Sequence, residues 1–141
     1  MERTAKCQCE GFRVTVTGEP AFTIVCHCEE CQRRSGVPLT SNAYFHKSNI
    51  RLEGEKKVYT RPANEGRSFH NYFCPNCGST ICWTLDVFPD LYGVATGAFN
   101  DPTFHPPSMS IYERSKYAWV SVPNVEHYQG MPNLDQLRLN S

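Results

Sequence analysis

Three cysteines lie within six residues of one another, at Cys26, Cys28 and Cys31. Thiolate sulfur is a preferred ligand of zinc, and a C-x-C-x-x-C run can bend around one tetrahedral ion so that a single loop supplies three of its four ligands. The fourth position is then left for water, a substrate or another side chain. The spacing predicts a zinc site of the kind that can take part in chemistry.

Two further cysteine pairs make a complete set of four ligands: Cys7 with Cys9, and Cys74 with Cys77. The second pair sits in a C-P-x-C-G turn, where proline fixes φ and glycine permits positive φ, so that backbone N–H groups can point at the thiolates. Structural zinc sites take four protein ligands, whereas catalytic sites take three. We therefore expect one closed site and one open site.

The eighth cysteine, Cys82, decides whether the second site is open. If Cys82 reached that ion, both sites would be closed and the protein would be a binding module. It lies in a strand-like segment, residues 80–85, where a cysteine is usually a small buried hydrophobic residue. We expect that role, which leaves the second site open.

The chain of 141 residues is long enough for one domain, expected over residues 1–141 with a core at about 4–122. We find no long apolar run and no secretory signal, which favours the cytoplasm. Because that compartment is reducing, we expect the cysteine pairs to be metal ligands rather than disulfides. Fourteen basic residues balance fourteen acidic ones. This neutral charge argues against nucleic acid and membrane as partners.

The elements that must position the cysteines read as short strands. Phe12, Val14 and Val16 alternate with polar residues, which predicts a half-buried strand, and residues 22–25 predict a second one. We expect these two to form a hairpin around residues 18–20, so that the first two cysteine segments start close in space. A short helical turn from about Glu29 should end at Gly36.

Further strands are expected at residues 42–45, 49–52, 57–61 and 68–73, whose spacing suggests an antiparallel meander, and at residues 80–85, 91–99 and 108–112. Gly93 and Gly97 should mark bulges or a close backbone approach. The tail from Pro123 reads as irregular. The sequence therefore predicts a mostly β domain with its metal sites at the edges.

Four segments together resemble the glutathione-dependent formaldehyde-activating enzyme family, which includes a centromere protein V branch: K-C-Q-C-E-G-F-R-V-T-V-T-G-E-P, V-C-H-C-E-E-C-Q-R-R-S-G, F-C-P-N-C-G-S and I-Y-E-R-S-K-Y-A-W. The resemblance implies a β-tent fold of stacked antiparallel sheets and two zinc ions. It implies a structural zinc held by Cys7, Cys9, Cys74 and Cys77, and a second zinc held by Cys26, Cys28 and Cys31. Lys6 and Glu10 stand where the family often has glycine.

The same resemblance implies condensation of glutathione with formaldehyde to S-hydroxymethylglutathione, which is classed as carbon–sulfur lyase chemistry. Zinc favours a thiolate at neutral pH and polarises a small carbonyl, so a glutathione sulfur would fill the open position. Thiols also add to formaldehyde unaided, and three thiolates weaken zinc as an electrophile. A non-enzymatic, zinc-stabilised binding module therefore remains an alternative, whereas neutral charge disfavours an adaptor like the centromere branch.

Several neighbouring side chains have two interpretations. Arg33 and Arg34 either bind the carboxylates of a peptide thiol such as glutathione or are solvated charges. His27 is a proton shuttle or, as we expect from alternation, turns away from the metal toward solvent or a backbone carbonyl. The aromatic candidates for a pocket are more often core residues: Tyr44, Phe45, Trp83, Tyr112, Tyr117 and Trp119.

Overall fold

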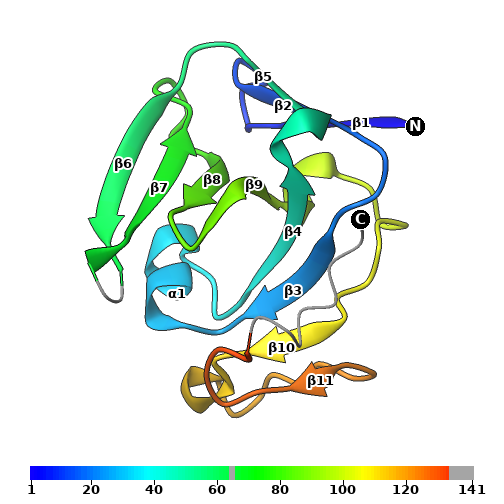
Figure 1. Ribbon diagram of the computed structural model, residues 1–141, viewed down its shortest axis with the longest axis vertical. Coiled ribbons are helices and arrows are strands. Elements are labelled where there is room, and N and C mark those ends of the chain that lie inside the picture. Colours follow the sequence, from blue (N-terminus) through cyan, green and yellow to red (C-terminus); the bar gives the residue numbers. More distant parts are fainter. Residues whose placement is uncertain (64–65, 134–141) are drawn as a thin grey trace.

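The computed structural model describes residues 1–63 and 66–133, and its strands form two sheets (Figure 1). The smaller sheet has the order β1-β2-β5, and the larger has the order β11-β10-β3-β4-β9-β8-β7-β6. The fold is mostly β, as predicted. No helix within the described residues is long and apolar enough to cross a membrane.

The strands are β1 (Glu2–Lys6), β2 (Arg13–Thr17), β3 (Phe22–Cys26), β4 (Thr40–His46), β5 (Ile50–Glu53), β6 (Lys57–Pro62), β7 (Ser68–Phe73), β8 (Thr80–Leu85), β9 (Phe88–Ala95), β10 (Met109–Ile111) and β11 (Glu126–His127). The α-helix α1 (Glu29–Ser35) and the 3-10 helices η1 (Lys47–Asn49), η3 (Thr96–Phe99) and η4 (Glu113–Ser115) lie between these strands. The glycine that ends α1 is Gly36, which adopts the left-handed conformation predicted for a helix stop.

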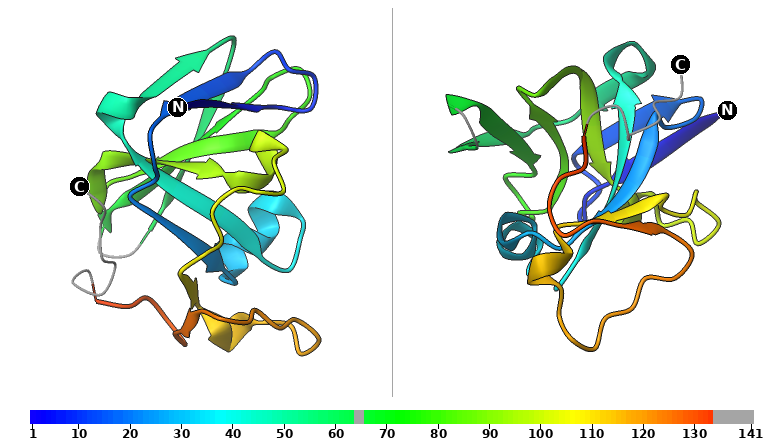
Figure 2. Two further views of the ribbon diagram at one scale, coloured as in Figure 1. Left: turned by 90° about the vertical axis from the view of Figure 1, so that its right-hand side faces the viewer. Right: turned by 60° about the horizontal axis from the view of Figure 1, so that its bottom comes forward.

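The two faces of the large sheet bury two separate cores. One face packs against the small sheet, and its core includes Phe12, Phe45 and Cys82. The other face carries Tyr44 and Trp83 together with Cys26. In Figure 2, the small sheet and α1 lie on opposite sides of β3 and β4. The alternation of each strand thus decides which of the two cores a side chain joins.

The predicted hairpin between residues 12–17 and 22–25 is wrong. β2 pairs with β1 and β5, whereas β3 pairs with β4 and β10, so the two strands belong to different sheets. The strand β1 was not predicted from the sequence, because Ala5 is its only buried residue. Gly18, at φ +77°, turns the chain out of the small sheet instead of into a hairpin.

Three other expectations need correction. The strand predicted over residues 91–99 ends at Ala95, where η3 begins. The large sheet is not wholly antiparallel, because β10 pairs in parallel with β3 and with β11. The tail after Pro123 includes the short strand β11, and its last residues, 134–141, lie outside the described residues.

Gly93 is a point of close approach, as predicted. A Cβ atom built on it would lie 2.0 Å from Nε1 of Trp83 on the neighbouring strand β8, whereas one built on Gly97 would meet no atom within 4 Å. The absence of a side chain at Gly93 makes room for the indole, which is fully buried and donates a hydrogen bond to the Tyr44 hydroxyl at 3.2 Å. This contact fixes the positions of Tyr44 and Trp83 in the core that also contains Cys26.

Candidate metal centres

The first cysteine group joins the loop after β1 to the loop after β7. The sulfur atoms of Cys7, Cys9, Cys74 and Cys77 all lie within 4.8 Å of one another. The sulfurs of Cys7 and Cys9 are 3.7 Å apart, and those of Cys9 and Cys74 are 3.6 Å apart. Ligands placed tetrahedrally at a zinc–sulfur distance of about 2.3 Å are separated by about 3.8 Å. The donor set and its spacing therefore fit a four-cysteine zinc site.

Backbone and hydroxyl donors hold this group in place. The N–H of Phe12 donates to the sulfur of Cys7 at 3.2 Å, and the hydroxyl of Ser79 lies 3.3 Å from the sulfur of Cys77. The N–H of Gln8 donates to that same hydroxyl at 3.3 Å, which ties the two loops together. Cys9 and Cys74 are 65 positions apart in the sequence, so the sheets must form before the site is complete.

Burial raises the pKa of these thiols, whereas hydrogen bonds from neighbouring donors lower it. The Ser79 hydroxyl is the main reason that the pKa of Cys77 is lowered to about 5, whereas burial raises the pKa of Cys7 to about 11. A cluster of thiolates repels itself, so full ionisation of all four sulfurs needs a cation among them. A divalent metal supplies that charge, in agreement with the geometric fit.

The second cysteine group lies where β3 leads into α1. Cys26 ends the strand, Cys28 caps the helix by accepting a hydrogen bond from the Cys31 N–H at 3.3 Å, and the three sulfurs lie within 4.8 Å of one another. Within residues 1–63 and 66–133, no fourth histidine, cysteine or carboxylate joins this group. The set of donors fits zinc with one open position.

Cys82 does not close the second group. It is fully buried among the core residues under the small sheet, on the face of the large sheet opposite to Cys26. Burial raises the pKa of its thiol to about 12, so it stays protonated. The prediction that Cys82 is a buried hydrophobic residue is confirmed.

The three thiols share charge unequally. Hydrogen bonds from Cys26 and Cys28 lower the pKa of Cys31, and the same contacts raise the pKa of Cys26. One thiolate is thus stabilised by two neutral neighbours. A state with three thiolates needs a positive ion, so metal binding and deprotonation are coupled in this group.

His27 lies between two of these cysteines but faces a different partner. Its ring is fully buried, and Nε2 lies 2.8 Å from the hydroxyl of Ser110 on β10. The expectation that it would point to solvent or to a backbone carbonyl is therefore wrong. Because β10 pairs with β3, a buried hydroxyl stands beside the ring, a placement that the sequence order alone does not indicate.

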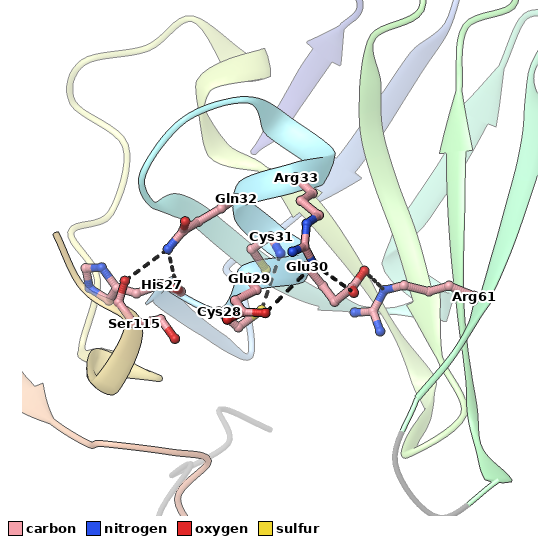
Figure 3. A network of polar contacts seen from close by, with 9 residues as sticks. All are labelled: His27, Cys28, Glu29, Glu30, Cys31, Gln32, Arg33, Arg61 and Ser115. Atoms are coloured by element: carbon pink, nitrogen blue, oxygen red, sulfur yellow. Dashed lines mark hydrogen bonds and ion pairs between the residues drawn. The ribbon is translucent and has the colours of Figure 1, made fainter.

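Two side chains of α1 fasten the cysteine loop to the rest of the molecule (Figure 3). The Gln32 amide donates to the backbone oxygens of His27, at 2.8 Å, and of Ser115, at 3.1 Å. On the other side of the helix, Glu30 forms an ion pair with Arg61 of β6 at 3.5 Å. The loop therefore contacts both the β10 side and the β6 side of the large sheet.

The predicted arginine contacts have other partners. Arg33 forms ion pairs with Glu29 and Glu30 on the surface of α1, and the guanidinium of Arg34 lies 4.1 Å from the centre of the Trp83 ring. Neither arginine lines the cavity described below. Their contact with a thiol substrate stays a prediction.

A cavity of about 910 Å³ opens beside the three cysteines. Its lining combines the cysteine loop with an aromatic wall and with arginines from distant segments, which are Arg61, Arg67 and Arg114. Of the aromatic candidates named from the sequence, Tyr44 and Tyr112 line the cavity. Phe45 belongs to the opposite core, and Tyr117 and Trp119 are exposed and packed edge to face.

The sequence analysis missed the cavity's other main residues, which are Phe22, Asn42, Phe88 and the three arginines. Phe22 carried a signal, since it lies on the same face of β3 as Cys26 by strand alternation. The arginines carried none, because the order of strands in the sheet brings them to the site.

Comparisons with known proteins agree with this arrangement. A family model described as glutathione-dependent formaldehyde-activating enzyme matches residues 2–115. The crystal structure of a Rhodobacter sphaeroides protein resembles this fold with a TM-score of 0.56 and 21% sequence identity, over 73% of this chain and 91% of that chain. This likeness concerns the fold alone. No curated protein gives a significant match.

Proposed function

Because the chain belongs to the glutathione-dependent formaldehyde-activating enzyme family, we propose that it is a zinc-dependent carbon–sulfur lyase acting on an adduct of glutathione or a related thiol. In this proposal Cys7, Cys9, Cys74 and Cys77 hold a structural zinc. The reaction takes place at the second group, formed by Cys26, Cys28 and Cys31.

The observation that carries this proposal is the position of the second group. Its three sulfurs lie on the wall of the large cavity, and no fourth side chain within the described residues completes the ligand set. The first group, in contrast, already has four sulfurs within 4.8 Å. A site with three ligands that faces a cavity has room for a thiol ligand from solution.

The residues around the cysteines suit a peptide thiol. A zinc ion bound there supplies positive charge that favours the deprotonated form of an incoming thiol. Arg61, Arg67 and Arg114 contribute to the cavity lining, and a guanidinium group matches the geometry of a carboxylate. The ion pair between Arg61 and Glu30 holds one of these groups next to the cysteine loop. Thiol binding at the cysteines and carboxylate binding at the arginines would orient the peptide in one direction.

The test combines zinc analysis with a binding measurement on the wild type and on Cys28→Ser. Serine is a good helix N-cap, so this variant keeps the start of α1 while it removes one sulfur. We expect close to two zinc ions per chain in the wild type and one in the folded variant. In calorimetric titration, only the wild type should bind glutathione.

Cys82→Ala is the matched control, because it removes a buried thiol that belongs to neither ligand group. It should keep both zinc ions and the binding of glutathione. Two zinc ions in a wild type that binds no thiol, or unfolding of Cys28→Ser, would contradict the proposal. Either result would indicate instead a binding module in which both zinc ions are structural.

A further inference from the structure

The wall of the cavity beyond the cysteines is aromatic. Phe22 and Tyr44 stack with their ring centres 4.7 Å apart, and Phe88 packs edge-on at 6.0 Å from Phe22 and 6.5 Å from Tyr44. All three rings line the same cavity as Cys26. The first two are held rigidly, since Phe22 pairs with Tyr44 across the ladder between β3 and β4 and both are buried.

This wall lies too far from the cysteines for a one-carbon substrate to reach it. Phe22, Ile24 and Cys26 lie on one face of β3, and at about 3.3 Å per residue Phe22 is about 13 Å along the strand from Cys26. Formaldehyde adds a single carbon to a thiol. That single carbon would not reach the apolar surface that the rings present to the cavity, so the aldehyde part of the adduct would gain no apolar contact there.

Arginines come to the lining from both sides of the strands that carry the rings. Arg61 and Arg67 come from β6 and the segment before β7, and Arg114 comes from η4. The rings come from β3, β4 and the start of β9, which lie together in the middle of the sheet. A ligand that fills the cavity therefore needs carboxylates toward the flanking arginines and a flat apolar group over the strands between them.

Asn42 lies between the cysteines and the rings. It pairs with Ile24 across the ladder, lines the cavity and is 2% exposed, and its Oδ1 has no hydrogen-bond partner within the described residues. A buried amide oxygen without a donor is unfavourable, so a ligand with a hydroxyl group at this depth would satisfy it. The adduct of a thiol with an aldehyde carries such a hydroxyl, whereas the free aldehyde does not.

We propose that this cavity accepts thiol adducts of aldehydes that carry an extended, flat apolar group, with that group on Phe22, Tyr44 and Phe88. This inference rests on the proposed function, because it takes the thiol to be bound at the three cysteines. In the reaction, the thiol sulfur bonds to the aldehyde carbon and the carbon–oxygen π bond breaks. The thiol proton ends on that oxygen as the hydroxyl, and the reverse step restores thiol and aldehyde without any change of oxidation state.

The experiment uses stable thioethers that resemble such adducts: S-methylglutathione, S-benzylglutathione and S-(3-phenylpropyl)glutathione. Calorimetric titration of the zinc-loaded wild type should show affinity rising along this series. Because a buried phenyl ring contributes like a large apolar side chain, we expect the longest thioether to bind roughly tenfold or more tightly than the methyl compound.

Phe88→Ala tests the aromatic wall, and Trp119→Ala is the control because that ring is 73% exposed and outside the cavity. Phe88→Ala should bring the affinities of the three thioethers close together, while the control keeps the preference for the phenyl compounds. Phe88→Leu keeps apolar volume if the alanine variant unfolds, and it should retain part of the preference.

The outcomes separate this inference from the proposed function. If all three thioethers bind with equal affinity, or if Phe88→Ala keeps the preference, the inference is overturned while thiol binding at the cysteines stands. If neither glutathione nor any thioether binds to the zinc-loaded protein, the proposed function fails and the inference fails with it.

Discussion

The two cysteine groups use the same ligand type in opposite surroundings. The four-cysteine group lies beside the small sheet, where two loops supply its ligands. The Phe12 N–H donates to the Cys7 sulfur, and the Ser79 hydroxyl accepts from the Gln8 N–H and contacts the Cys77 sulfur. The three-cysteine group lies on the other face of the large sheet, at the wall of a cavity of about 910 Å³. One group joins segments of the fold, and the other faces space that a ligand can enter.

The difference shows how chain connectivity and a neighbouring cavity assign roles to identical side chains. Cys7 and Cys74 belong to the core shared by the two sheets, so a metal between them links elements that are distant in sequence. The second group is local, since all three of its cysteines lie between the end of β3 and the first turn of α1. Loss of a metal from a local loop disturbs less of the fold than loss of a metal that joins two loops.

The largest expected effect comes from breaking the four-cysteine group. Cys74→Ser should lower the free energy of unfolding by about 3 kcal/mol or more, because a structural zinc contributes directly to folding. Cys28→Ser, measured in parallel by thermal unfolding and zinc analysis, should lose its zinc with a much smaller loss of stability. Equal losses of stability in the two variants would contradict the assignment of different roles.

An intermediate effect is expected from filling the space at Gly93. Gly93→Ala places a methyl group 2.0 Å from Nε1 of the buried Trp83, so the indole or the strand must shift, at a cost of about 1–3 kcal/mol in urea unfolding. The variant should alter Trp83 fluorescence and keep both zinc ions. Gly97→Ala is the control, since its new methyl group meets no atom within 4 Å. Equal destabilisation by both would show that the contact with Trp83 is not the cause.

The smallest effect concerns the backbone beside the four-cysteine group. Glu10 adopts φ +66°, a left-handed conformation that suits glycine. Glu10→Gly should raise the free energy of unfolding by up to about 1 kcal/mol, because relief of strain outweighs loss of the exposed ion pair with Lys6. Glu10→Ala keeps the strain and loses the ion pair, so it should not stabilise. A stabilisation of the same size in both variants would contradict this reasoning.

The sequence by itself determined the features that depend on neighbouring residues. The spacing of Cys26, Cys28 and Cys31 brings their sulfurs together through one strand end and one helical turn, and Gly36 ends that helix as predicted. Most strand positions followed from alternation for the same reason, since the side-chain period of two is a local property. The burial of Cys82 also followed from its place in a strand.

Only the tertiary structure decided which strands are neighbours, and this order creates the cavity. Local patterns do not encode pairing between distant segments, so the hairpin expected between β2 and β3 was wrong and β1 was missed. For the same reason the sequence did not predict that Arg61, Asn42 and Phe88 lie around the cysteines, because each comes from a different strand. Ligand spacing is a property of a few consecutive residues, whereas the surroundings of the ligand depend on how the whole sheet is assembled.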